Sequence, residues 1–208
     1  EEVTYDDGAE RKILLLIEGG LASGQVLPSI EVPSDRFAGM SWVSDWGVSP
    51  IVFAGFGLKD HLRVAILKQS VDAVRRTVYG HSGWRKIDGD LHYLHGGGAI
   101  GTVGTVSGIQ VDLPGELKNL TLPDPPLADQ LQSDFAAIRR LLDLAHPHLM
   151  YSLLAAISRA VVGGADFSIH LCGPTGVFKS EVAALSQQFF GPSLDARHLP
   201  GSWSSTEN

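Results

Sequence analysis

One stretch of the sequence combines residue types suited to binding phosphate. Residues 173–180 read GPTGVFKS, and an apolar run with the helical period follows them as far as Gly191. A phosphate-binding loop turns backbone N–H groups toward one point at the start of a helix, and it supplies a lysine for the outer phosphates and a hydroxyl for Mg²⁺. Lys179 and Ser180 provide the lysine and the hydroxyl. The stretch therefore predicts a phosphate-binding site with a ligand for Mg²⁺.

The match to the pattern GxxxxGK[ST] fails at one position, because Phe178 stands where the pattern has glycine. Glycine suits that position since the backbone can need a left-handed conformation and a side chain can obstruct the phosphates. Two conformations are open to Phe178. Positive φ costs a residue with a side chain roughly 1 to 2 kcal/mol, whereas negative φ would turn the ring into an apolar pocket. The competing interpretation is an ordinary β-turn-α connection with an exposed first helical turn.

Each residue of the loop receives a predicted role. Lys179 is the candidate catalytic residue, and Ser180 is the candidate metal ligand. Thr175 offers N–H and hydroxyl contacts, and Pro174 stiffens the turn. The predicted nucleotide-binding set is Gly173, Pro174, Thr175, Gly176, Val177, Phe178, Lys179 and Ser180.

The elements that must position this loop are a strand before it and a helix after it. Residues 166–172, DFSIHLC, indicate a short strand with a buried face that includes Cys172, and residues 179–191 indicate a helix ended by Gly191 and Pro192. Ahead of them, residues 127–144 and 147–162 predict two helices that form a hairpin, the second with Pro147 in its first turn. This order is that of the first strand, loop and helix of a P-loop NTPase domain.

The chain before residue 115 is richer in strand signals. Residues 11–32 predict two strands around a Gly-rich turn, residues 36–48 a short helix with Trp42 and Trp46 on one face, and residues 58–70 an amphipathic helix. Asp88-Gly89 predicts a hairpin turn. We therefore expect an α/β (α+β) chain made of a β-rich module at 1–115, a proline-rich linker at 116–126, and the N-terminal part of a P-loop NTPase domain, truncated, at 127–208.

Composition limits the partners and the compartment. The 16 Lys and Arg residues against 23 Asp and Glu give a net charge of −7, which disfavours binding to nucleic acid or anionic membranes through the overall field. Apolar runs are far shorter than the roughly 20 residues that span a bilayer. A single cysteine excludes an internal disulfide and fits a cytoplasmic protein.

Other residues with chemical potential fit structural roles better. His92 and His95 are three apart and point to opposite faces of a strand, and no cysteine or carboxylate joins them and His81 in a zinc site. Trp84 beside Arg85 and Lys86 suits stacking on a single-stranded base, but an anchor for the hairpin is the expected role. His146 and His148 are expected to be surface or capping residues of the following helix.

The segments HLCGPTGVFKSEVAALSQQFFG and DARHLPGSWSSTEN together resemble the P-loop region of a bacterial and phage domain-of-unknown-function family, found in primase-helicase-like proteins of mobile elements. YGHSGWRKIDGDLHYLHGGGAIG and IQVDLPGELKNLTLPDPP resemble that family's hairpin and connector. The resemblance covers about residues 46–208. It implies ATP and Mg²⁺ binding at 173–180, and an aromatic residue before the lysine is a variant of the family's loop.

The sequence thus predicts the ATP-binding part of a helicase-like motor of mobile-element replication, acting on DNA as part of a longer protein and assembling as a ring. After Ser180 no apolar run ends in Asp or Glu, so we expect this chain by itself to bind ATP without hydrolysing it. Two alternatives remain. One is a scaffold module that binds DNA or protein and no longer holds nucleotide, and the other is a small-molecule kinase using the same loop.

Overall fold

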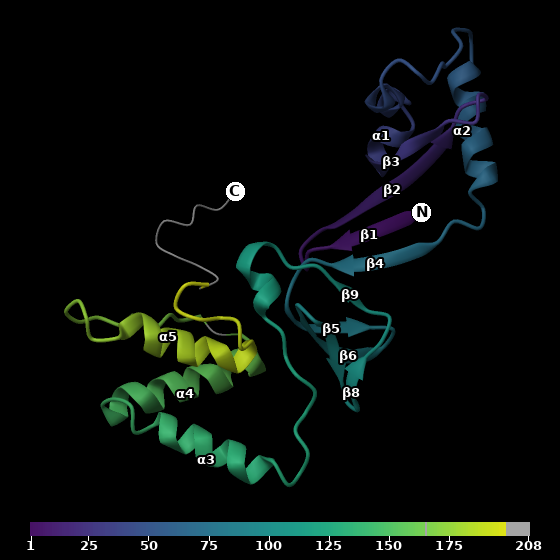
Figure 1. Cartoon of the computed structure of the whole chain (residues 1–208). Coiled ribbons are helices and arrows are strands. Elements are labelled where there is room, and N and C mark those ends of the chain that lie inside the picture. Colours follow the sequence, from purple (N-terminus) through teal and green to yellow (C-terminus); the bar gives the residue numbers. More distant parts are fainter. Residues whose placement is uncertain (165, 199–208) are drawn as a thin grey trace. The chain divides into compact units, whose positions relative to one another are not determined.

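The computed structural model describes residues 1–164 and 166–198, and these form two compact units. Unit 1 is Glu1–Gly80 and unit 2 is His81–Asn208. The fold is mixed α/β, with two sheets and several helices (Figure 1). The two units divide between Gly80 and His81, ahead of the expected linker at 116–126. The linker stays a prediction.

Unit 1 is built on a mixed sheet. Its strands β1 (Glu2–Asp6), β2 (Arg11–Gly20), β3 (Val26–Pro33) and β4 (Arg75–Tyr79) lie in the order β3-β2-β1-β4. β2 and β3 form the expected antiparallel hairpin, with a register shift between Ile17 and Gly19 (Figure 1). β1 runs antiparallel to β2 and parallel to β4. The carboxyl ends of β1 and β4 therefore lie at the same edge of the sheet.

The core of unit 1 lies over β2 and β3 and is built around tryptophan. α1 (Ser34–Phe37) and η1 (Ser41–Trp46) replace the single helix expected over residues 36–48, with Met40 at φ 55° before η1. Trp42 is buried, stacks on Phe37 at 5.8 Å between ring centroids, and meets Trp46 edge-on at 5.5 Å. Core packing of both indoles is thus confirmed.

The predicted helix over residues 58–70 is present as α2 (Leu58–Gln69). Its residues are exposed except Arg63 and Ile66, which are partly buried, and Ile66 packs against the tryptophan core. Leu58, Leu62 and Leu67 remain exposed. The amphipathic pattern therefore predicts the helix correctly but not the extent of its burial.

Unit 2 begins with an antiparallel sheet of β5 (Gly83–Ile87), β6 (Asp90–His95), β7 (Gly98–Gly101) and β8 (Gly104–Val106), in sequence order. Asp88 and Gly89 join β5 to β6 with φ values of 51° and 99°, which confirms the predicted turn. Leu94 of β6 and Ala99 of β7 are paired across the two strands and are fully buried. β9 (Gln110–Val111) follows.

The proline-rich segment of unit 2 is anchored and does not hang free. It holds a short 3₁₀ helix, η2 (Gly115–Asn119), and continues without helix or strand to residue 127. Leu120 O accepts a hydrogen bond from Gly96 N at 2.6 Å. A Cβ on Gly96 would lie 2.3 Å from Lys118 O, and one on Gly191 would lie 2.1 Å from Asn119 O. Residues 118–122 therefore pass within backbone contact of both the β6–β7 turn and Gly191.

Three α-helices and a 3₁₀ turn make the C-terminal part of unit 2. They are α3 (Leu131–Leu141), α4 (Pro147–Val162), α5 (Lys179–Gln187) and η3 (Gln188–Phe190). α4 and α5 contact one another, and Met150, Leu153 and Ala184 are buried (Figure 1). His146 caps α4 by accepting the N–H of His148 at Nδ1, as expected. Within the described residues, each helix is too short or too polar to cross a membrane.

Candidate functional site

Residues 173–178 of the predicted phosphate loop form an irregular turn that leads directly into α5 (Lys179–Gln187), whose first two residues are Lys179 and Ser180. Gly176 has φ 88°, and Phe178 has φ 54° and ψ 28°, which is the left-handed conformation. Phe178 therefore adopts a backbone geometry that normally favours glycine. Of the two conformations open to this residue, the structure has the one with positive φ.

The ring of Phe178 points away from any apolar pocket, since its side chain is 75% exposed. Residues 173–178 are all exposed, and Val177 is half-exposed. The space beside the loop backbone is thus open to solvent, and the strain of the left-handed residue is not offset by burial of its ring.

Lys179 folds back over the loop. Its ammonium donates hydrogen bonds to Gly173 O at 3.0 Å and to Pro174 O at 2.6 Å. Lys179 is partly buried, unlike the six residues before it. The positive charge of Lys179 is therefore held against the first two residues of the loop.

The N-terminus of α5 has no side-chain cap, and Phe178 is its N-cap residue. The first intrahelical bond runs from Val182 N to Phe178 O at 3.0 Å. The N–H groups of Lys179, Ser180 and Glu181 come before this bond, so they have no acceptor within the helix. The helix dipole at this end favours negative charge, although Glu181 already places one carboxylate in the first turn.

The prediction of a strand before the loop is wrong. Residues 166–172 have no strand pairing among the described residues, and they are exposed except for partly buried Leu171. Phe167 is 57% exposed and Ile169 is 39% exposed, so the predicted buried face is not formed. Ser168 Oγ lies 3.0 Å from His170 Nε2 in this segment. Strand-like residue types alone make no strand, because a strand needs a partner for its backbone groups.

Cys172 is also placed differently from expectation. It was predicted to be buried in that strand, and it is an exposed free thiol. The reason is the same, since the segment that carries it lacks a covering element in the described part of the chain.

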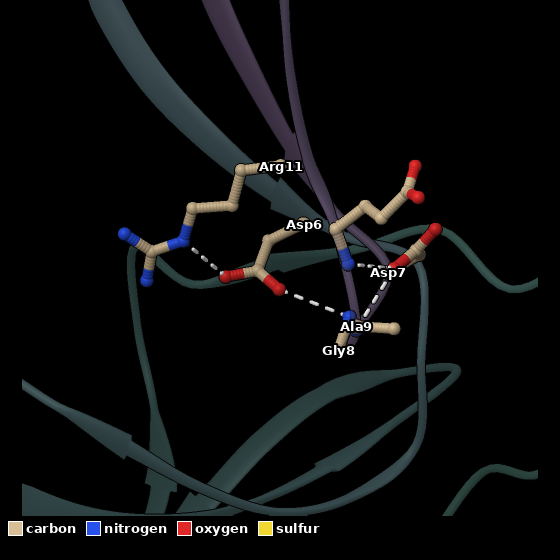
Figure 2. A network of polar contacts seen from close by, with 6 residues as sticks. Asp6, Asp7, Gly8, Ala9 and Arg11 are labelled. Carbon is tan, nitrogen blue, oxygen red and sulfur yellow. Dashed lines mark hydrogen bonds and ion pairs between the residues drawn. The ribbon is translucent and has the colours of Figure 1, made fainter.

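A second polar cluster lies in the turn between β1 and β2 (Figure 2). Asp6 is buried and accepts Gly8 N–H at 3.0 Å through Oδ1 and Arg11 Nε–H at 2.8 Å through Oδ2. Asp7 Oδ1 accepts the N–H groups of Ala9 and Glu10 at 2.9 and 2.7 Å. These bonds, first that of Glu10 and then that of Ala9, lower the pKa of Asp7. The carboxylates close the turn, which gives them a structural role.

Trp84 of unit 2 has a structural role. Trp84 Nε1 donates to Val161 O at 2.7 Å, and its ring meets Tyr93 edge-on at 5.2 Å, which confirms an anchoring role. Within residues 1–164 and 166–198, no three His, Cys, Asp or Glu side chains gather as metal ligands would.

The burial of two polar residues is not apparent from the sequence. Asp6 is 1% exposed and His95 is 5% exposed. His95 Nδ1 accepts N–H groups from both Gly97 and Leu122 at 3.2 Å. A local signal existed for Asp6, because Asp-Asp-Gly favours a turn. None existed for the bond to Leu122, since its partner is 27 residues away.

Comparisons with known proteins give no match: no protein-family model matches the chain, no curated protein is significantly similar to it, and no solved structure is significantly similar to it. The family resemblance of the loop and hairpin motifs therefore remains a prediction.

Proposed function

We propose that residues 173–180 bind the phosphates of a nucleoside triphosphate with Mg²⁺, and that the chain is the ATP-binding part of a P-loop nucleoside-triphosphatase. The backbone N–H groups of the loop and of the first turn of α5 meet the phosphates. Lys179 turns from the loop carbonyls to the outer phosphates, and the Ser180 hydroxyl joins the coordination of Mg²⁺.

The observation that carries this proposal is the left-handed backbone of Phe178. A side chain at positive φ costs roughly 1 to 2 kcal/mol, and strained backbone is kept where something depends on it. Phe178 precedes Lys179 at the position that the pattern reserves for glycine, and its ring is directed to solvent. A left-handed conformation is the one that glycine would adopt readily at this position, so the backbone of Phe178 supports the proposal.

The Lys179 ammonium supports the same assignment. Its two acceptors, Gly173 O and Pro174 O, are loop carbonyls, so no carboxylate has to be displaced before it meets a phosphate. Charge-assisted bonds to phosphate oxygens are stronger than bonds to neutral carbonyls. The exchange of partners on nucleotide binding is therefore favourable.

The test is a titration of fluorescent ATP with Mg²⁺ against the wild-type chain and the Lys179→Ala variant. We expect saturable binding by the wild type and a loss of at least about tenfold in affinity in the variant, because a charged hydrogen bond contributes roughly 1.5 to 3 kcal/mol. Lys68→Ala, which removes an exposed lysine from α2, is the matched control and should bind as the wild type does. Equal binding by all three proteins would exclude the loop as the site.

We further propose that the motor function belongs to replication of a phage or mobile element. This rests on the resemblance to primase-helicase-like proteins, which also implies DNA as the partner and a ring as the assembly. Turnover stimulated by single-stranded DNA, measured in a longer form of the protein, separates a motor from a small-molecule kinase.

A scaffold module without nucleotide is the second candidate. The exposure of Phe167 and Ile169 favours it, because a working phosphate loop follows a strand held inside a sheet. Absence of ATP binding by the wild-type chain, with a folded protein confirmed by circular dichroism, would select this candidate.

A further inference from the structure

A buried histidine in unit 2 fastens the proline-rich segment to the small sheet. His95 ends β6, and its Nδ1 lies 3.2 Å from Gly97 N and 3.2 Å from Leu122 N. Both neighbours are N–H donors, so Nδ1 must be the acceptor. The imidazole is therefore neutral, with its proton on Nε2.

The other ring nitrogen, Nε2, has no acceptor among the described residues that would stabilise a positive charge on the His95 ring. His95 is 5% exposed, and in the described part of the chain Nε2 is buried without a hydrogen-bond partner. A protonated ring would bring a second N–H, on Nδ1, against two N–H donors. Protonation thus converts both hydrogen bonds into repulsive contacts.

The charged and titratable groups around the ring give the imidazolium little support. On β6 these are Asp90, His92 and Tyr93, and burial raises the pKa of Tyr93, which keeps it neutral. β7 carries none in its sequence, GAIG, and β5, which pairs with β6, carries the cations Arg85 and Lys86. The proline-rich segment brings the following: Glu116, which accepts from Asn119 Nδ2 at 2.7 Å; Asp124, which accepts from Thr105 Oγ1; and the cation Lys118. The two carboxylates of this segment are therefore already engaged.

We propose that His95 is an acid-sensitive latch, which holds residues 118–122 on the β6–β7 turn when neutral and releases them when protonated. The same segment lies against Gly191, directly after η3, so release also loosens the packing at the C-terminal end of α5 and η3. The latch is independent of nucleotide binding and is present in the chain by itself.

The pH range follows from the pKa. Burial lowers the pKa of His95 from its ordinary value of 6.5. Because the folded pKa lies below the unfolded one, the contribution of His95 to stability is complete above about pH 6.5. It is lost as the pH falls through the folded pKa.

The test is amide hydrogen exchange by NMR at pH 7.5 and pH 5.0, corrected for the intrinsic pH dependence of exchange. We expect the protection of the Gly97 and Leu122 amides to fall at least about tenfold at the lower pH, since each loses its acceptor. The Ala9 and Glu10 amides should keep their protection, because the lowered pKa of Asp7 leaves its carboxylate charged at pH 5.0.

Two variants make the test specific. In His95→Asn, the amide oxygen takes the place of Nδ1 as an acceptor that does not titrate, so the protection of Leu122 should become the same at both pH values. His61→Asn, at an exposed position of α2, should behave as the wild type. Unchanged wild-type protection at pH 5.0, or an equal loss in wild type and His95→Asn, would overturn the latch.

A second measurement covers the case in which His95→Asn does not fold. The ¹⁵N signals of the wild-type histidine rings report which nitrogen carries the proton. At pH 7.5, we expect His95 with Nδ1 unprotonated and Nε2 protonated. A proton on Nδ1 would rule the proposal out.

Discussion

At the scale of single residues, Phe178 shows how a position can keep glycine's backbone without glycine. Its φ of 54° lies in the left-handed region, while its ring is three-quarters exposed. No burial of the ring is available to offset the cost of this conformation. The left-handed conformation of Phe178 should therefore lower the free energy of unfolding, and a substitution of this residue should show by how much.

Phe178→Gly should raise the free energy of unfolding by about 1 kcal/mol, because glycine adopts positive φ without the clash of a Cβ. Binding of Mg²⁺-ATP should be retained, since the ring is not needed for the loop geometry. Chemical denaturation and the ATP titration measure the two effects. Phe178→Ala is the control: it removes the ring but keeps the Cβ, so it should not gain stability.

The same residue marks the limit of what sequence shows about the site. The helix predicted after residues 173–178 is confirmed, because α5 begins at Lys179. The choice between positive and negative φ at Phe178 was left open, because it depends on the whole loop. The bond between Leu122 and His95 was beyond reach for a similar reason, as it joins residues 27 positions apart.

At the scale of elements, local patterns predicted the helices and hairpins well and missed what depends on distant partners. α2, α4 and the Asp88-Gly89 turn follow from periodicity and turn chemistry. The parallel pairing of β4 with β1, with Glu2 opposite Arg75, is not visible in the sequence because the two strands are far apart along the chain. β1 was missed although it forms an antiparallel hairpin with the next strand, β2. The strand at 166–172 was wrong for the opposite reason, since a strand-like sequence lacks a described partner.

Gly191 illustrates a close approach between two elements. Its φ of 168° is open to any residue, so only space requires glycine there. Gly191→Ala would place a Cβ 2.1 Å from Asn119 O. We expect a loss of roughly 1 to 3 kcal/mol, as in other overpacked sites, measured by chemical denaturation. Gly39→Ala, whose Cβ would meet its nearest atom at 3.7 Å, is the control and should change stability little; equal effects would show that the contact with Asn119 is absent.

At the scale of the whole molecule, the anchoring of the proline-rich segment affects where proteolysis should begin. A linker at 116–126 would be cut readily if it hung free. In unit 2, however, Leu120 and Leu122 are hydrogen-bonded to the β6–β7 turn. In unit 1, residues 51–54 have neither helix nor strand, and Phe53 and Phe56 are highly exposed. The exposed loop of unit 1 is therefore the better substrate.

Brief digestion with chymotrypsin at pH 7.5 should cut after Phe53 or Phe56 before it cuts after Leu120 or Leu122, and mass spectrometry of the fragments identifies the sites. First cleavage after Leu120 or Leu122 would mean that the proline-rich segment is not anchored. At pH 5.0, with a protease active there, release of His95 should make the 118–122 segment more susceptible than in His95→Asn.

The limited packing of α2 against unit 1 has a consequence for how unit 1 unfolds. Only Arg63 and Ile66 of this helix are even partly covered, so little apolar surface returns to water when α2 opens by itself. A helix of that length is marginal without packing. α2 should therefore fray in a sub-global opening while β1, β2 and β3 stay paired, and unit 1 should lose its helix before it loses its sheet as denaturant is added.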